Sequence, residues 1–214
     1  MNKPIKKFSF QGVEGAYSEL AGKNIYPKAN SVPCKTFEEM FESVRLDKSD
    51  VAIVPIENSK AGRVADTQRL IPQSKLKIIG EFFLNINHCL LACKGSTIET
   101  IKRIHSHEQA LAQCRSNILD KNKDMVIAAD TAGAAKLVSS WNNIEDAAIA
   151  SSLAAEYYNL NIIQNEFQDS KNNVTRFLVM SKDQLEIGPD EKDTMMTLIF
   201  KAVSYTHLTL PTKA

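Results

Sequence analysis

The sequence predicts an α/β protein with mainly parallel strands. Short apolar runs alternate along the chain with amphipathic segments of helical length. Polar loops with glycines, hydroxyls or amides separate most runs from the segment that follows. The length of 214 residues suffices for one large domain or two lobes. Because ligands of open α/β sheets bind where strands lead into helices, we expect the functional residues in these loops.

Each element follows from a local pattern. Apolar or alternating runs predict strands over residues 7–11, 50–56, 76–83, 86–92, 101–105, 125–129, 146–150 and 162–167, and a last, buried strand near Thr175. Amphipathic spacing predicts helices that start near residues 16, 36, 64, 106, 134 and 151. Thr36 and Glu39 form the capping box of the second helix, and a single helix is expected to run from Ser106 to about Lys121. Pro55 is expected to end its strand.

The composition excludes several classes of protein. The net charge is +1 and the charges of both signs are interspersed, which argues against a nucleic-acid partner or a membrane-binding face. No apolar run is long enough to cross a bilayer, and the basic residues 1–7 lead into a polar segment instead of the apolar core of a signal peptide. We therefore expect a cytoplasmic protein with a small-molecule or protein partner.

Neither the cysteines nor the known cofactor motifs indicate a metal or a cofactor. The four cysteines include no Cys-x-x-Cys pair, and Cys89 and Cys93 are spaced too far along a predicted strand to hold one ion. We expect reduced, mostly buried thiols and no metal site. Phosphate-loop, dinucleotide-binding and nucleophile-elbow patterns are missing from the sequence. Any chemistry is therefore expected to need no cofactor.

Several loops could form an anion site. Hydroxyls, amides or glycines occupy four junctions, at residues 15–18, 58–62, 106–107 and 130–133. Free N–H groups of a first helical turn suit a carboxylate or phosphate. For each of Ser106, Thr131 and Ser151 alone, an ordinary helix N-cap is the favoured interpretation, and only the several junctions together indicate an anion pocket. His105 and His107 lack a carboxylate that would orient them for catalysis, so solvated or capping histidines are favoured.

Residues 172–177, Asn-Asn-Val-Thr-Arg-Phe, join a polar loop to an apolar strand. The hydroxyl of Thr175 and the guanidinium of Arg176 thus stand at the start of a segment expected to be buried. An edge strand with a surface arginine is the alternative.

In order along the chain, these loops resemble those of the prephenate dehydratase family. The matching pieces lie at residues 10–18, 54–64, 88, 106–114, 130–132, 147–150 and 172–177. The resemblance implies a catalytic domain over residues 1–183 with the two-lobed, periplasmic-binding-protein-like fold of type II and an inter-lobe cleft. The first lobe would comprise about residues 1–80 and 168–183, and the second about residues 81–167.

The resemblance also implies an activity and a set of site residues. The family removes carbon dioxide and the ring hydroxyl of prephenate to form phenylpyruvate, on the route to phenylalanine. Thr175 would assist the departing oxygen, and we hypothesise that a buried, protonated Glu57 supplies its proton. The residues expected to bind the substrate are Asn58, Ser59, Ser106, Gln113, Thr131 and Arg176. Arogenate is an alternative substrate, and a non-catalytic binder of a small carboxylate is the alternative of another class.

The C-terminal part departs from the family pattern. Residues 184–202 resemble a linker and the first strand of a truncated regulatory ACT domain, whereas residues 203–214 resemble no part of the family. Feedback control by phenylalanine is therefore expected to be absent. A homodimer is an assembly that the sequence leaves open.

Overall fold

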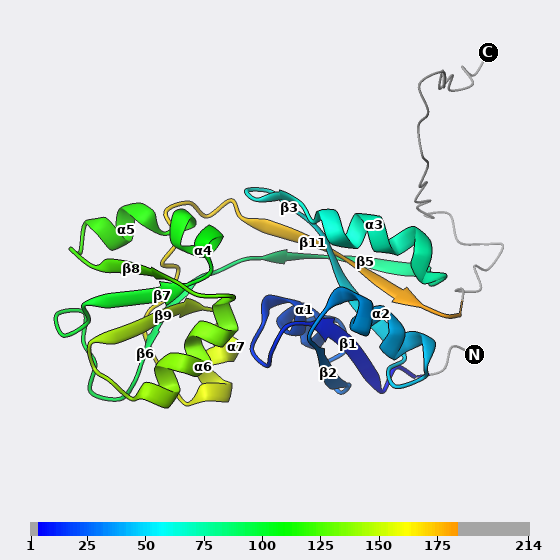
Figure 1. The fold of residues 1–214 in the computed structure, drawn as a ribbon, viewed down its shortest axis with the longest axis horizontal. Helices are drawn as coiled ribbons and strands as arrows, with labels where there is room; N and C mark the ends of the chain where they lie inside the picture. Colours follow the sequence, from blue (N-terminus) through cyan, green and yellow to red (C-terminus); the bar gives the residue numbers. More distant parts are fainter. Residues whose placement is uncertain (1–3, 184–214) are drawn as a thin grey trace, which may run out of the picture.

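The protein folds into two lobes, each a mixed sheet with helices on both faces (Figure 1). The computed structural model describes residues 4–183. The chain crosses from the first lobe to the second between Asn85 and Cys89 and returns between Gln164 and Val174. The two-lobed α/β fold expected from the resemblance is confirmed. The expected limit at residue 80 falls inside a strand of the first sheet, which runs to Asn85.

The first lobe is built around a sheet with the order β2-β1-β3-β11-β5, and β4 pairs with β3. Its strands are β1 (Lys7–Gln11), β2 (Asn30–Cys34), β3 (Val51–Asn58), β4 (Gly62–Arg63), β5 (Lys77–Asn85) and β11 (Val174–Ser181). Its helices are α1 (Tyr17–Ile25), α2 (Phe37–Arg45) and α3 (Ala65–Ser74). Side chains of β11 alternate between two cores: Phe177 and Val179 pack with β1 and α1, and Leu178 and Met180 pack with α2 and α3.

The second lobe repeats this design with the order β10-β6-β9-β7-β8. Its strands are β6 (Cys89–Ala92), β7 (Arg103–Ser106), β8 (Asp124–Ile127), β9 (Asp146–Ala150) and β10 (Asn161–Gln164). Its helices are α4 (Glu108–Gln113), α5 (Arg115–Leu119), α6 (Thr131–Trp141) and α7 (Ser152–Tyr158). Helices α6 and α7 cover one face of the sheet, and α4 and α5 cover the other.

The two sheets share one topology. In each, a strand that enters from the other lobe runs antiparallel to both of its neighbours: β11 lies between β3 and β5, and β6 lies between β9 and β10. The pairs β1–β2, β1–β3, β7–β8 and β7–β9 are parallel. The sheets are therefore mixed where the sequence predicted mainly parallel strands. The parallel strands still lead into helices, and the loops after β1 and β9 meet between the lobes, where Ser151 Oγ donates to Gly15 O.

Several local expectations need correction. Strand β3 continues three residues beyond Pro55, because the register against β11 shifts there and the missing N–H falls at a bulge. The helix expected over residues 106–121 is broken at Cys114 into α4 and α5. Strand β2 was not predicted. The capping box is half present: Thr36 accepts from Glu39 N at 3.1 Å, but Glu39 accepts from Lys35 N.

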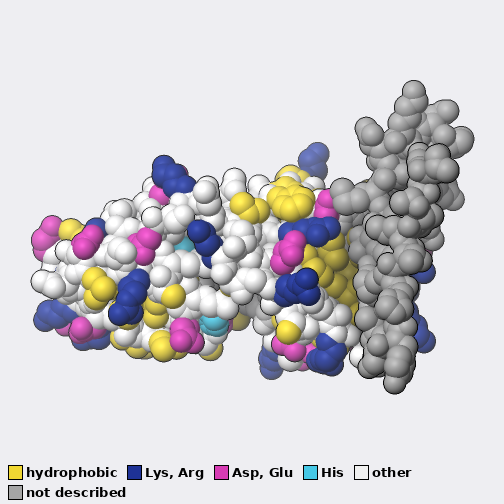
Figure 2. Space-filling model, turned by 90° about the horizontal axis from the view of Figure 1, so that it is seen from above, with side chains coloured by type: hydrophobic (Ala, Val, Ile, Leu, Met, Phe, Trp, Pro, Cys, Tyr) yellow, Lys and Arg dark blue, Asp and Glu magenta, His cyan; other side chains and the backbone are white. Residues whose placement is uncertain are grey.

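The described part of the chain has no helix long and apolar enough to cross a membrane. Figure 2 shows acidic and basic side chains scattered among one another on the visible face, as the interspersed charges of the sequence predict. The linker, the truncated regulatory strand and the tail expected over residues 184–214 lie outside the described residues.

Candidate functional site

Thr175 lies in the second position of β11, near the point where the chain returns from the second lobe. It is paired in register with Asn58 at the end of β3. The Thr175 Oγ1 atom accepts a hydrogen bond of 2.9 Å from Asn58 Nδ2. Its side chain is on the face of the sheet that carries Phe177 and α1. The residue is only 9% exposed, so its hydroxyl is largely shielded from bulk water.

The amide of Asn58 can take only one orientation. Its Oδ1 accepts from the backbone N–H groups of Lys60 at 2.9 Å and Ala61 at 2.8 Å, which are donors in any state. The Nδ2 group therefore faces Thr175 and donates to its oxygen. Among the residues that the structure describes, no protein acceptor is recorded for the Thr175 hydroxyl hydrogen. That hydrogen is available to an oxygen atom of a ligand.

Amides and an imidazole connect this pair to the second lobe. Asn58 Nδ2 also donates to Asn173 Oδ1 at 2.7 Å, and Asn173 Nδ2 donates to Gln113 Oε1 at 2.7 Å. Gln113 is the last residue of α4, and the same Oε1 lies 2.8 Å from His88 Nε2. His88 Nδ1 lies 2.8 Å from the hydroxyl of Tyr17, at the start of α1. The hydrogen bonds thus leave the first lobe at Asn173 and return to it at Tyr17.

A second set of contacts holds the lobes together beside this network. Ser151 Oγ donates to Gly15 O at 2.6 Å, and Tyr158 donates to Glu14 O at 2.7 Å. Tyr157 donates to Glu19 Oε1 at 2.7 Å, and Glu19 is fully buried. These bonds join the loop after β1 and the first turn of α1 to both ends of α7. Through Ser151 and Gly15, the loops after β9 and β1 are in direct contact.

Glu57 and Arg176 lie on the opposite face of the sheet from Thr175. They are paired in register, and Arg176 Nη1 lies 3.5 Å from Glu57 Oε1. Arg176 is held more closely by Glu81 on β5, with its Nη2 atom 2.8 Å from Glu81 Oε2. The side chain of Glu57 is 48% exposed. The expectation that Glu57 is buried beside Thr175 is therefore wrong: its side chain is about half exposed and, since neighbouring strand residues point to opposite faces, it lies on the other side of the sheet.

The predicted hydroxyls occupy different environments. Ser59 lies in the turn between β3 and β4, where its Oγ accepts from Val174 N at 2.9 Å. Ser106 is fully buried and donates to Ile149 O at 2.6 Å, so its hydroxyl is already committed. Thr131 is the first residue of α6. The structure thus brings Asn58, Gln113 and Thr175 into one network and leaves these three hydroxyls outside it.

The N-caps also differ from the sequence expectation. His107 caps α4, and Asp130 caps α6 by accepting from Gly133 N at 2.6 Å. Ser106 and Thr131 are therefore not caps. Ser151 is confirmed as the cap of α7, since its Oγ accepts from Ala154 N at 3.1 Å.

Burial favours the neutral forms of the titratable groups of this network. It lowers the pKa of His88, against an opposing contribution from the hydrogen bond to Gln113. It raises the pKa of Tyr17 well above its ordinary value. The nearby thiols of Cys89 and Cys114 also have raised pKa values because they are buried. The four cysteines are free and buried, as predicted, and residues 4–183 contain no group of His, Cys, Asp or Glu that could hold a metal ion.

Comparison with known proteins gives the family. A sequence profile described as prephenate dehydratase matches residues 8–185. The chain belongs to this family. It is 41% identical over 193 residues to a bifunctional N-acyl-homoserine lactone acylase/prephenate dehydratase of Komagataeibacter europaeus, covering 90% of this chain and 69% of that protein. The family resemblance read from the loops is thereby confirmed.

Two further relatives define the extent of the match. Arogenate dehydratase 2 of Petunia hybrida is 42% identical, over 86% of this chain and 47% of its own length. The crystal structure of prephenate dehydratase in complex with L-Phe from Arthrobacter aurescens has a TM-score of 0.76 and 33% identity, over 83% of this chain and 60% of that one. The chain thus spans about half the length of the Petunia relative.

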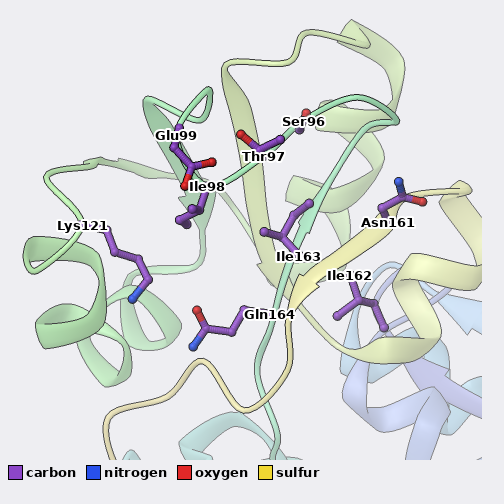
Figure 3. A pocket seen from close by; sticks show the side chains of 9 residues that line it. All are labelled: Ser96, Thr97, Ile98, Glu99, Lys121, Asn161, Ile162, Ile163 and Gln164. Carbon is purple, nitrogen blue, oxygen red and sulfur yellow. The ribbon is translucent and has the colours of Figure 1, made fainter.

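The hollow in Figure 3 is separate from this network. It has a volume of about 650 Å³ and lies against β10, at the edge of the second sheet. Its lining includes Lys121, Glu99 and the isoleucines Ile98, Ile162 and Ile163. None of the site residues predicted for this dehydratase-family chain lines it, so it does not serve as the candidate active site.

Sequence reasoning did not assign a role to Tyr17, His88 or Asn173. His88 and Asn173 lie in segments that match the family, but their partners are distant in the chain: 25 residues separate His88 from Gln113, and 60 separate Gln113 from Asn173. Only the crossing of the chain between lobes brings these segments together. The one available signal was the pair of asparagines before Thr175, of which the second is nearly fully buried.

Proposed function

We propose that this chain is a dehydratase that removes carbon dioxide and the ring hydroxyl from prephenate or arogenate. The proposal is supported by membership of the prephenate dehydratase family. One observation carries the mechanism: the Thr175 oxygen accepts from Asn58 and keeps its own hydrogen for another acceptor. The product would be phenylpyruvate from prephenate, or phenylalanine from arogenate, so the enzyme would be a lyase of aromatic amino-acid biosynthesis.

The reaction requires that the substrate carboxylates are held in position and that the departure of the ring hydroxyl is assisted. As the ring carboxylate leaves as carbon dioxide, its electron pair enters the ring, and the hydroxyl leaves with the electrons of the carbon–oxygen bond. The departing oxygen gains negative charge, which the Thr175 hydroxyl can stabilise by donating a hydrogen bond. The Asn58 N–H polarises that hydroxyl and strengthens it as a donor. Formation of the aromatic ring supplies the driving force, so we expect no cofactor to be needed.

The other predicted residues enter the proposal with separate roles. Free N–H groups at the starts of α4 and α6, near Ser106 and Thr131, would bind the substrate carboxylates. The backbone N–H groups of residues 59–61 are already bonded to Val174 O and Asn58 Oδ1, so Ser59 would act by shaping this turn. Gln113 and Asn58 would hold the site together across the lobes. Arg176, paired with Glu81 and Glu57, would fix the start of β11 from the far face of the sheet. A direct route for a proton from Glu57 to Thr175 has no geometric support.

The first prediction concerns Thr175. We expect Thr175→Ala to lower kcat on the order of 10²-fold or more with little change in KM, because the lost hydrogen bond forms mainly in the transition state. Thr175→Ser keeps the hydroxyl and should retain most of the turnover. Steady-state kinetics with purified protein, prephenate and no added cofactor measure both. Equal activity of the alanine and serine variants would remove Thr175 from the mechanism.

Prephenate and arogenate, two close analogues, are both candidate substrates. Prephenate carries a keto group where arogenate carries an amino group, and the relatives include proteins named for each. Parallel assays with both substrates determine the preference, and the same assays with added phenylalanine measure whether it inhibits the reaction. Binding of either substrate without turnover would favour the alternative of a small-carboxylate binder.

A further inference from the structure

The side chains between Thr175 and His88 form a chain in which the direction of every hydrogen bond is determined. We call Asn58, Asn173 and Gln113 the amide chain. Each amide has one oxygen that only accepts and one nitrogen that only donates, so fixing one amide fixes the next. The chain links the first lobe to the second, and the backbone sets its direction at one end.

The direction starts at the turn after β3. The N–H groups of Lys60 and Ala61 point at Asn58 Oδ1, so Asn58 Nδ2 must face Thr175 and Asn173. Its two hydrogens serve Thr175 Oγ1 at 2.9 Å and Asn173 Oδ1 at 2.7 Å. Thr175 Oγ1 must therefore accept a hydrogen bond from Asn58, and the hydroxyl hydrogen of Thr175 points away from Asn58.

The donor and acceptor roles of Asn173, Gln113 and His88 follow in the same way. Asn173 uses its oxygen for Asn58, so its nitrogen donates to Gln113 Oε1 at 2.7 Å. The oxygen of Gln113 then meets His88 Nε2 at 2.8 Å, which requires a hydrogen on that ring nitrogen. Burial lowers the pKa of His88, which favours the neutral ring, and a neutral ring with its hydrogen on Nε2 has none on Nδ1. In that tautomer Nδ1 accepts from the hydroxyl of Tyr17 at 2.8 Å, which directs the single hydroxyl hydrogen to His88 and not to Asn87 O.

We propose that the amide chain couples the orientation of the Thr175 hydroxyl to the tautomer of His88, so that Asn173 and His88 are positioning residues for Thr175. In the observed arrangement of hydrogen bonds, His88 carries its hydrogen on Nε2 and the Thr175 hydrogen is free for a ligand, and the two states occur together. Its catalytic consequence rests on the proposed function, whereas the coupling itself does not.

A reversed arrangement is available to the same side chains. Tyr17 also lies 3.0 Å from the carbonyl oxygen of Asn87. With the hydrogen on Nδ1, His88 would donate to Tyr17, which would donate to Asn87, and Gln113 would donate to Nε2. Asn173 would then donate to residue 58, which would have to accept. The backbone N–H groups of Lys60 and Ala61, which point at Asn58 Oδ1, exclude this alternative.

The test is Asn58→Asp, an isosteric change. The new carboxylate keeps the bonds from Lys60 and Ala61, which favour its ionised form, but it presents an acceptor to Thr175 and Asn173. We expect the side-chain amides of Asn173 and Gln113 to rotate by about 180°, so that oxygen and nitrogen exchange places. His88 should then change from the Nε2–H to the Nδ1–H tautomer. Nitrogen-15 NMR of the imidazole reads the tautomer directly. His105, bonded to Asp146, is the internal reference, and its signals should not move.

A matched control separates this effect from that of an added charge. Asn24→Asp places the same carboxylate on an exposed amide that bonds only to Leu20 O, and it should leave His88 in the Nε2–H form. Asn173→Asp gives a second route, since an ionised carboxylate there also forces Gln113 to donate. An Nδ1–H tautomer in the unaltered protein, or no change of His88 in either network variant, would overturn the proposal. Melting curves establish that the variants are folded.

The kinetic arm tests the link to Thr175. In Asn58→Asp the Thr175 hydrogen is captured by the new carboxylate, so kcat should fall on the order of 10²-fold. In a Thr175→Ala background the same change should cost little further, because its effect passes through Thr175. Full additivity would overturn the coupling to Thr175. If the unaltered protein turns over neither substrate while the tautomer still switches, the proposed function fails and the coupling stands.

Discussion

At the scale of single residues, adjacent positions in β11 serve different sides of the sheet. Thr175 faces α1 and the amide chain, and Arg176 faces the carboxylates of Glu81 and Glu57. Alternation along a strand is sufficient to separate them. A motif of consecutive residues is therefore not one cluster, and the ion pair on the far face acts on Thr175 only through the backbone.

A variant of Glu57 tests this separation. We expect Glu57→Gln to keep turnover within about threefold of the unaltered protein, since an exposed pair of this kind contributes only about 0–1 kcal/mol. The pH dependence of kcat should also be unchanged. Steady-state kinetics across the pH range measure both. A large loss of turnover that depends on pH would return Glu57 to the catalytic set despite its position.

The sequence was sufficient to select Thr175, Asn58 and Gln113, because they lie in segments that match the family in order. It was insufficient to join them to His88 and Tyr17. Their hydrogen bonds depend on where the chain crosses between lobes, and local periodicity carries no information about that crossing. The hydroxyls of Ser106 and Thr131 were misjudged for a related reason: an adjacent side chain, His107 or Asp130, took the cap.

At the scale of elements, strong local sequence patterns were sufficient to predict a strand or helix, and weak patterns were not. Strand β9 was predicted with its observed bounds, because it is a fully buried run between polar residues. Strand β2 was missed, since Asn30 and Pro33 within it are exposed and proline is uncommon in strands. The break between α4 and α5 was missed because residues on both sides of it pack into the same core.

The pairing of β7 with β9 creates a buried acidic site that controls stability at low pH. Asp146 accepts from Arg103 Nε at 2.8 Å and Nη2 at 2.9 Å, and it lies 2.8 Å from His105 Nε2. These bonds lower the pKa of Asp146 from 3.8 to about 2, and the hydrogen bond from Arg103 makes the largest contribution. Its contribution to folding is therefore present above pH 3.8 and lost as the pH falls toward 2.

We expect Asp146→Asn to lower the free energy of unfolding by about 2 kcal/mol at neutral pH, from the size of the pKa shift. The difference between variant and unaltered protein should shrink as the pH falls from 4 to 3. Urea denaturation at a series of pH values measures it. Asp66→Asn is the control, because the side chain of Asp66 is 70% exposed and its change should have little effect at any pH. A constant difference would contradict the prediction.

At the scale of the whole molecule, the lobes meet where one glycine permits close contact. Gly15 has a φ of +87°, and a Cβ atom there would lie 2.7 Å from the Cα of Ala154 on α7. The same residue receives the hydroxyl of Ser151 on its carbonyl and donates its N–H to Glu19 at 2.7 Å. The lobes can approach this closely here only because residue 15 has no side chain.

The last prediction is that Gly15→Ala weakens the contact between lobes more than its backbone strain explains. Gly62→Ala is the matched control, because Gly62 has a similar φ of +83° but no atom within 4 Å of the added Cβ. We expect about 1 kcal/mol of destabilisation at Gly62 from backbone strain alone. At Gly15 a further 1–3 kcal/mol, roughly, should follow from overpacking against Ala154. Denaturation curves of both variants give the difference, and kcat should fall in Gly15→Ala as the amide chain is drawn apart. Equal losses of stability at the two glycines would mean that the lobes accommodate the added methyl group, and that their close contact at Gly15 is not what holds Gln113 against Asn173.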